Sequence, residues 1–257
     1  MRWSVGVTTA PRADGDDTWR AQARKRGFRE GPAIETTLAS LRAAGFSNIT
    51  VFAEPGSHRP SGDCASLYAN WVDRPELYGG WDNWRYALDY LGRFNPLCPA
   101  PEAILLCQDD VILCKGVREF LDATLWPSNA GVISLYCSSK HATGNGLSTI
   151  SVGSSYWGAL AFAFPPEQAQ ALLASNIPNT LQGNRIDNRV GLWANSTSRR
   201  LWVFTPSLAQ HTGEFRSAMR HGHGQGMSAN DFVGEDFDAR TLIMESAKET
   251  RELEAVV

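Results

Sequence analysis

Two adjacent carboxylates, Asp109 and Asp110, interrupt an apolar segment that runs from Ala103 to Leu113. An apolar run this short, with prolines just before it, predicts a buried strand of an α/β sheet. Ionised carboxylates in such a strand are costly unless a cation pairs with them. Carboxylate oxygens suit Mg²⁺ or Mn²⁺, and two acids can hold such an ion while leaving positions open for phosphate oxygens. The pair therefore predicts a divalent-metal site for a nucleotide-activated substrate.

The two acids are expected to have different roles. We expect Asp110 to bind the metal directly and Asp109 to orient the ribose or a metal-bound water. Neighbouring residues on a strand point to opposite faces, so the register decides between this assignment and its reverse. His211, which follows a strand late in the chain, is a candidate imidazole ligand of the same metal, and an ordinary structural role is its alternative.

The elements that must position these residues alternate along the chain. Strands are predicted at 3–7, 48–53, 103–113, 131–136, 155–164 and 201–204, and helices at 34–44, 81–91, 117–124, 167–174 and from 187 onward. The helix at 81–91 shows the clearest pattern, since Trp81, Trp84 and Leu88 recur at three- and four-residue spacing. Alternating strands and helices predict one α/β domain with a mostly parallel mixed sheet flanked by helices.

Composition limits the classes of protein. The chain has 257 residues, of which 43% are hydrophobic, so a substantial core is expected. A net charge of −3 gives no overall attraction to nucleic acid or membranes. The five cysteines form no CxxC pair, which favours reduced, structural thiols. Without a leader-like amino-terminal run or an apolar stretch of membrane-spanning length, we expect a cytoplasmic protein with no membrane span.

The order of six features resembles the GT-A fold glycosyltransferases. These features are Thr8-Thr9-Ala10-Pro11-Arg12 after the first strand, the helix 35–45, the strand 49–54, the helix 83–88, Gln108-Asp109-Asp110, and Pro206-Ser207-Leu208-Ala209-Gln210-His211. The resemblance covers about residues 1 to 240, with Gln108 standing where the family often has an acid. It implies a nucleotide-sugar donor whose diphosphate is bridged by Mn²⁺ or Mg²⁺ to the acidic motif.

The resemblance also implies a division of the chain. Residues 1–115 would form the donor-binding half, residues 116–240 the acceptor-binding half of the same domain, and residues 241–257 a carboxy-terminal tail. In the donor half, Thr8, Arg12 and Glu54 stand where strand ends would meet the base and ribose, and Asn83 begins the helix before the metal strand. Turn or cap roles are the alternative for each of these residues.

A proton acceptor is required if the enzyme inverts the sugar's configuration, because the acceptor hydroxyl loses a proton as the new bond forms. The resemblance implies Asp187 as this base, because Asp187 lies at a predicted helix start where similar GT-A enzymes often carry it. A helix N-cap is the alternative role for this residue. A retaining enzyme would need no such base.

Three consecutive residues, Tyr156, Trp157 and Gly158, are candidates for a platform under a sugar ring. Aromatic faces suit the apolar faces of pyranoses, and glycine permits close approach, although core packing also explains aromatic residues here. The basic run 20–29 could clamp the donor diphosphate or follow a nucleic-acid backbone, with a solvated loop as the alternative. The His-Gly-His-Gly run at 221–224 could bind metal or belong to a loop that closes over the donor.

The sequence therefore predicts a metal-dependent hexosyltransferase, with a UDP-hexose as the first donor to test. The acceptor is expected to be a glycan or lipid-linked saccharide, or alternatively a hydroxymethylated DNA base as in phage DNA modification. A sugar-nucleotide nucleotidylyltransferase is a different enzyme class that fits an α/β sheet with a metal-binding acid. It would normally carry a glycine-rich, lysine-bearing phosphate loop, which residues 8–12 do not provide. A non-catalytic sugar- or nucleic-acid-binding module is the remaining alternative.

Overall fold

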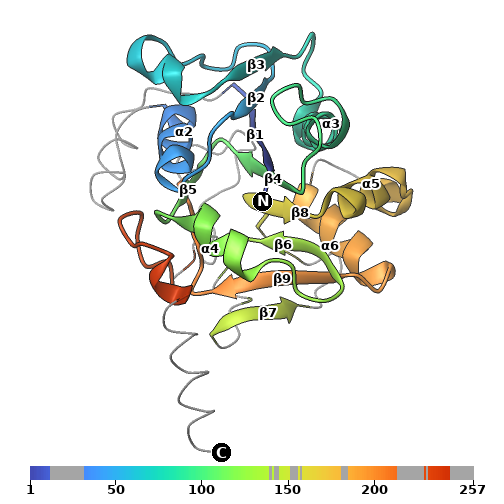
Figure 1. Ribbon diagram of the computed structural model, residues 1–257. Helices are drawn as coiled ribbons and strands as arrows, with labels where there is room; N and C mark the ends of the chain where they lie inside the picture. Colours follow the sequence, from blue (N-terminus) through green and yellow to red (C-terminus); the bar gives the residue numbers. More distant parts are fainter. Residues whose placement is uncertain are drawn as a thin grey trace, which may run out of the picture.

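The computed structural model describes residues 1–11, 32–138, 141, 145–150, 156, 158–180, 185–212, 229 and 231–243. Its centre is an eight-stranded sheet in the order β3-β2-β1-β4-β8-β6-β9-β7 (Figure 1). The strands are β1 (Trp3–Thr9), β2 (Thr50–Ala53), β3 (Asn70–Asp73), β4 (Ala103–Gln108), β6 (Ala130–Ser134), β7 (Gly146–Ile150), β8 (Ala161–Phe164) and β9 (Arg200–Thr205). The first four strands in this order are parallel to each other, β6 and β9 are parallel, and β8 and β7 run antiparallel to their neighbours. The predicted class, one α/β domain with a mixed sheet, is confirmed.

Helices cover both faces of this sheet, as Figure 1 shows. One face packs against α2 (Ala33–Ala43) and α4 (Val117–Thr124), and the other against α3 (Gly79–Arg93), α5 (Pro166–Ala174) and α6 (Ile186–Ser196). The strands supply both cores by alternation, since Leu105 and Cys107 join the first core while Ile104 and Leu106 join the second. In α3 the predicted face is buried, including Trp81, Trp84 and Leu88.

The expected halves of the chain share this sheet. Strand β4 of the first half pairs directly with β8 of the second, with Leu105 opposite Ala163. Of the expected tail, Leu242 and Ile243 pack against the core, so the chain is still part of the fold at these positions. All five cysteines are free thiols. Among the described residues, no helix has the length and apolar character needed to cross a membrane.

The structure differs from the prediction in the apolar segment that carries the two acids. The predicted strand 103–113 is two strands, β4 and β5 (Val111–Leu113), separated by a turn at Asp109 and Asp110. Strand β5 leaves the main sheet and pairs antiparallel with β10 (Ala209–His211) in a separate two-stranded sheet. The acids therefore lie at a junction of two sheets and not within one strand.

Several short elements were not predicted. They are the 3-10 turns η1 (Gly62–Leu67) and η3 (Ile177–Thr180) and the strands β3, β7 and β10. The predicted strand 155–164 is shorter than expected, because only 161–164 is strand in the described part. Strands β3 and β7 are edge strands with little buried surface, so their sequences carry only a weak apolar pattern.

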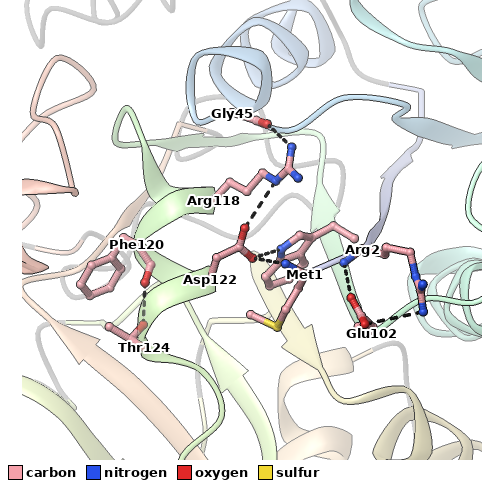
Figure 2. A network of polar contacts seen from close by, with 9 residues as sticks. Met1, Arg2, Gly45, Glu102, Arg118, Phe120, Asp122 and Thr124 are labelled. Carbon is pink, nitrogen blue, oxygen red and sulfur yellow. Dashed lines mark hydrogen bonds and ion pairs between the residues drawn. The ribbon is translucent and has the colours of Figure 1, made fainter.

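A polar network at the amino ends of β1 and β4 fixes the sheet to α4 (Figure 2). Asp122 of α4 accepts a hydrogen bond from the indole Nε1 of Trp3 over 2.8 Å and lies 3.8 Å from Nε of Arg118. The amino group of Met1 donates to the same carboxylate over 3.2 Å. The backbone amide of Arg2 donates to Glu102, just before β4, over 2.8 Å. These contacts hold the amino edge of the sheet together.

Candidate active site

The carboxyl ends of six strands lie along one edge of the sheet. Strands β1, β2, β3 and β4 are parallel, and β6 and β9 point the same way because β8 runs antiparallel between β4 and β6. In open α/β sheets, ligands bind outside the carboxyl ends of the strands. We call this the carboxyl edge, and Thr9, Glu54, Asp109 and Asp110 all lie on it.

Helix α2 contributes to the strand break at Asp109 and Asp110, because it binds the backbone of β5. The hydroxyl of Thr37 donates to the Val111 carbonyl over 2.8 Å and accepts from the Val111 amide over 3.1 Å. Ser40 holds both backbone groups of Leu113 in the same way, at 3.2 Å and 2.6 Å. Two helix hydroxyls one turn apart thus take the place of a neighbouring strand and satisfy the buried backbone of β5. They hold β5 beside α2 and outside the main sheet, after the turn that contains Asp109 and Asp110.

Asp110 and His211, the two predicted metal ligands, lie together. His211 is paired with Val111 across β10 and β5, and its Nε2 lies 3.2 Å from Oδ2 of Asp110. The side chains are 8% and 5% exposed. A buried carboxylate beside an imidazole at a sheet edge is a donor pair that suits Mn²⁺.

Backbone and side-chain contacts fix His211 in this place. The amide of Thr212 donates to the Asp110 carbonyl over 2.8 Å. The carboxamide of Gln210 is buried, accepts from the His211 amide over 3.0 Å, and binds both backbone groups of Ala229 at 2.9 Å and 3.1 Å. Gln210 was not predicted as a site residue, and its only signal in the sequence is its place next to His211.

Asp109 faces the other neighbour, strand β1. Oδ2 of Asp109 accepts a hydrogen bond from the hydroxyl of Thr9 over 2.6 Å, and both residues are buried. Thr8, the residue predicted for this region, points elsewhere, and its hydroxyl is 3.4 Å from the Cys107 carbonyl. The contact between β1 and the acid therefore comes from Thr9, because neighbouring strand residues point in opposite directions.

Glu54 and Asn83 lie where β2 meets the start of α3. Oε1 of Glu54 accepts from the backbone amides of Tyr78 and Gly79 over 3.0 Å and 2.6 Å, so it satisfies free amides at the helix start. The side-chain amide of Asn83 donates to the Phe52 carbonyl over 3.3 Å. Its buried Oδ1 has no hydrogen-bond partner among the described residues. Glu54 thus has the capping role that was its alternative, while Asn83 offers an acceptor near the carboxyl edge.

Arg74 is a candidate site residue that was not predicted. It follows β3 directly, and its amide donates to the Ala53 carbonyl over 2.8 Å. The guanidinium lies over the rings of Tyr78 and Tyr86, at 4.3 Å and 3.6 Å from their centroids. Within the part of the chain that the structure describes, Arg74 forms no ion pair. A cation held by aromatic rings at this edge suits an anionic or planar ligand. Nothing in the sequence marked Arg74 as a site residue, because its position depends on β3, which was not predicted.

Asp187 lies in the first turn of α6, half-buried. Its Oδ1 accepts from the Asn188 amide over 2.9 Å and its Oδ2 from the Gly158 amide over 3.2 Å. Burial raises the pKa of the Asp187 carboxyl above its ordinary value, and the Asn188 and Gly158 amides oppose this shift. The Leu160 carbonyl, two residues after Gly158, accepts from the Gln108 amide over 2.8 Å. This segment therefore connects Asp187 to the end of β4.

The expected sugar platform is not present at Tyr156. Its side chain is fully buried, its hydroxyl donates to the Tyr136 carbonyl over 3.2 Å, and its ring lies 6.0 Å from that of Phe162. The prediction was wrong for Tyr156 because the ring belongs to the core. Gly158 faces Tyr136, since an added Cβ would lie 2.5 Å from that ring. Trp157, Arg12, the basic run 20–29 and the His-Gly-His-Gly run lie outside the described residues.

A cavity of about 360 Å³ lies at the opposite, amino edge of the sheet, between Trp3, Phe46, Leu97 and Pro99. The two arginines on its walls, Arg2 and Arg118, form ion pairs with Glu102 and Asp122. Of the predicted site residues that the structure describes, none lines this cavity.

Comparison with known proteins gives no family for this chain. No protein-family model matches it, and no curated protein does. Solved structures give distant likenesses. A nucleotidyl transferase from Methanothermobacter thermautotroptrophicus has a TM-score of 0.47 at 14% identity, over 79% of this chain and 86% of that one. A nucleoside-diphosphate-sugar pyrophosphorylase from Vibrio cholerae RC9 has a TM-score of 0.43 at 7% identity, over 81% and 96%.

A third structure, HddC from Yersinia pseudotuberculosis, has a TM-score of 0.44 at 8% identity, over 83% of this chain and 94% of that one. The first two names correspond to the nucleotidylyltransferase alternative and not to glycosyl transfer. Likenesses this distant carry no argument about the reaction. The class of protein is defined by the chain's own sheet, a mixed α/β fold with acids at the carboxyl edge.

Proposed function

We propose that the protein is a nucleotide-sugar-dependent transferase of GT-A type that uses Mn²⁺ or Mg²⁺. The observation that carries the proposal is the buried pair of Asp110 and His211 at the carboxyl edge, 3.2 Å apart. A carboxylate and an imidazole from two different strands meet there, 101 residues apart in sequence. The fold must bring these two distant residues together and bury them, which sets the pair apart from an incidental contact at the surface.

The donor set fits a metal that arrives with a diphosphate. Within the described residues, no three His, Cys, Asp or Glu side chains converge into a metal site. A hard divalent ion held by one or two protein groups completes its shell with phosphate oxygens and water. Asp110 and His211 would hold the ion, with Asp109 beside it. When bound, the ion would neutralise charge on the departing diphosphate.

The nucleotide would lie across the ends of β1, β2, β3 and β4. Asp109, which Thr9 binds, and Asn83 present carboxylate and amide groups there, and Arg74 presents a guanidinium held by tyrosines. These groups suit ribose hydroxyls, a base edge and a phosphate. A UDP-hexose remains the first donor to test.

The acceptor would approach from the side of α6. Asp187 would take the proton of the acceptor hydroxyl while that oxygen bonds to the anomeric carbon and the bond from this carbon to the diphosphate breaks. A raised pKa suits a carboxylate in this role, because proton transfer is most effective when the base's pKa is nearer the working pH. This assignment makes the enzyme inverting. The acceptor itself, a saccharide or a hydroxylated DNA base, stays a prediction from the sequence.

Nucleotidylyl transfer to a sugar phosphate is the second candidate function. It uses the same carboxyl edge, nucleotide and metal, but it breaks a bond within a nucleoside triphosphate and releases pyrophosphate. The products separate the two reactions: glycosyl transfer releases a nucleoside diphosphate from a nucleotide-sugar. The second reaction does not need Asp187 as a base, because its attacking group is the phosphate of the sugar phosphate, which is already an anion.

The experiment that tests the proposal is calorimetric titration of UDP and then GDP into metal-free protein, with and without Mn²⁺. We expect one nucleotide to bind only with Mn²⁺, and Asp110→Asn to lose this binding. The matched control is Asp236→Asn, which changes an exposed acid with 88% side-chain exposure. Metal-independent binding, or equal binding by both variants, would contradict the metal site. If no nucleotide binds under any condition, the binding-module alternative replaces the transferase.

A further inference from the structure

The hydrogen bond between Thr9 and Asp109 joins the end of β1 to the acidic turn. The distance from Oγ1 of Thr9 to Oδ2 of Asp109 is 2.6 Å, and the residues are 4% and 3% exposed. A hydroxyl that donates to a buried carboxylate forms a charge-assisted bond, which is stronger than a neutral one. Asp110, the next residue, is held instead from β10 by His211. The two adjacent carboxylates are thus fixed from opposite sides.

We propose that Thr9 is a positioning residue that directs the Asp109 carboxylate toward the nucleotide and thereby separates the work of Asp109 from that of Asp110. The inference rests on the proposed function, because it assigns Asp109 to the nucleotide of that same site. Thr9 does not touch the reacting atoms. It acts through Asp109, whose rotation about its side-chain bonds it restricts.

The strand register gives Thr9 this position. Thr8 pairs with Gln108 across β1 and β4, so Thr9, the last residue of β1, comes next to Asp109, the first residue after β4. The Thr9 carbonyl also accepts from the Glu54 amide over 3.1 Å. Thr9 therefore connects the ends of β1, β2 and β4, the three strand ends nearest the expected nucleotide. Its β-branched side chain has restricted χ1 rotation, so the hydroxyl is held in one direction at little further entropic cost.

A purely structural hydrogen bond is the competing explanation. Such a bond would join β1 to the turn and stabilise the fold, but it would not distinguish nucleotide binding from metal binding. Under the proposal the two effects separate, because the Asp110 and His211 pair has its own supports in β5 and β10. The difference between nucleotide affinity and metal affinity is therefore the quantity to measure.

The test compares Thr9→Val, which removes the hydroxyl at nearly constant shape, with Thr9→Ser, which keeps it. The matched control is Thr50→Val in β2, because Thr50 is fully buried and its hydroxyl has no hydrogen-bond partner among the described residues. UDP affinity is measured by calorimetry at saturating Mn²⁺, with GDP in its place if GDP is the nucleotide that wild type binds. Mn²⁺ affinity without nucleotide is measured by electron paramagnetic resonance.

We expect Thr9→Val to weaken UDP binding about 10- to 100-fold, as for other residues that orient a ligating group, and to leave Mn²⁺ affinity unchanged. Thr50→Val should bind UDP like wild type, and Thr9→Ser, which keeps the hydroxyl but loses the methyl branch that restricts it, should weaken UDP binding far less than Thr9→Val. In an Asp109→Asn background, Thr9→Val should cost much less, because the group that it positions has lost its charge.

Two results would overturn the inference: UDP binding by Thr9→Val equal to wild type, or an equal loss of UDP and Mn²⁺ affinity. If Thr9→Val does not fold, Asp109→Glu tests the same alignment, since it moves the carboxylate by one methylene. Wild-type UDP affinity in Asp109→Glu would then count against positioning. Failure of the proposed function is distinguishable, because it would show first in wild type as no nucleotide binding at all.

Discussion

Asp110 and Asp187 are both carboxylates of the candidate active site, but their surroundings differ. Asp110 lies in a turn between two sheets, and its Oδ2 is 3.2 Å from Nε2 of the His211 imidazole. Asp187 accepts hydrogen bonds from the backbone amides of Asn188 and Gly158, and burial raises its pKa. A carboxylate beside a metal-binding side chain suits a cation, whereas a carboxylate with a raised pKa suits a proton.

This difference teaches how one fold can separate charge stabilisation from proton transfer. The Asp110 corner is built by strands β5 and β10, and the Asp187 corner by α6 and the segment before β8. Because different elements build them, a substitution in one corner should leave the other intact. The two corners can therefore be tested independently, by metal and nucleotide binding on one side and by turnover on the other.

The largest effect is expected from Asp187→Asn, which removes the proton acceptor and nearly keeps the side-chain shape. We predict that kcat falls about 10²- to 10⁴-fold, the usual contribution of general acid–base catalysis. Mn²⁺-dependent UDP binding should not change, because the Asp110 corner is intact. The measurement is steady-state release of UDP beside calorimetry of UDP, with the exposed Asp63→Asn as the control. Weaker UDP binding with unchanged kcat would assign Asp187 to the donor.

The next effect concerns the Asp110 corner. His211→Ala removes the imidazole at Nε2, and we predict that Mn²⁺ affinity falls at least about 10- to 100-fold, the cost of losing even an outer partner of a metal ligand. Single turnover at saturating Mn²⁺ should recover most of the activity, since the base remains. His58→Ala is the control, because His58 is 41% exposed and pairs with Glu35 and not with Asp110. Equal Mn²⁺ affinity in the two variants would remove His211 from the metal site.

More of the fold than of the candidate site could be predicted from the sequence. The short apolar runs at 3–7 and 103–113 correctly predicted β1 and β4, although the second run is divided into β4 and β5. The helical spacing of Trp81 and Trp84 correctly predicted α3. Asp110 and His211 were expected to bind one metal, and the structure brings their side chains to 3.2 Å, while the metal itself stays a prediction. These signals are local in sequence or depend on chemistry alone.

What the sequence could not predict depends on long-range contacts. At the strand break formed by Asp109 and Asp110, the hydroxyls of Thr37 and Ser40 on α2 bind the backbone of β5, and an apolar run carries no sign of these contacts. Which of Thr8 and Thr9 meets Asp109 depends on strand register, as does the direction of each acid. Tyr156 was misassigned for a similar reason, since its aromatic side chain suits a core and a sugar platform equally.

A smaller effect is expected on pH dependence. Burial raises the pKa of Asp187, and a base must be ionised, so kcat should fall at acidic pH with a midpoint above that of an ordinary aspartate. The sign for stability is the reverse. The folded state binds this proton more tightly than the unfolded state, so the group stabilises the fold at low pH and this contribution is lost as pH rises through the folded pKa.

Activity and the stabilising contribution of Asp187 should therefore change in opposite directions over the same pH range. The measurements are kcat against pH and the thermal midpoint of wild type minus that of Asp187→Asn against pH. We expect the difference in midpoint to decrease as pH rises and to level off once the carboxyl is ionised. A midpoint difference that increases with pH would mean that folding lowers the pKa of Asp187, which would contradict the raised pKa on which its assignment as the base rests.

The smallest change that still separates the two corners is Gly158→Ala. Gly158 has φ of +139°, and an added Cβ would lie 2.5 Å and 2.8 Å from two atoms of the Tyr136 ring, which is buried and cannot move freely. We predict a loss of about 1–3 kcal/mol in the free energy of unfolding, measured by urea denaturation. Gly62→Ala is the control, because Gly62 also has a positive φ, +56°, but has no atom within 4 Å of the added Cβ.

Gly158→Ala should also lower kcat, because the Gly158 amide donates to Asp187 and would be displaced. Mn²⁺-dependent UDP binding at the Asp110 corner should stay as in wild type. Equal loss of turnover and of UDP affinity would show that the two corners move as one unit, and the separation of charge stabilisation from proton transfer would then be wrong.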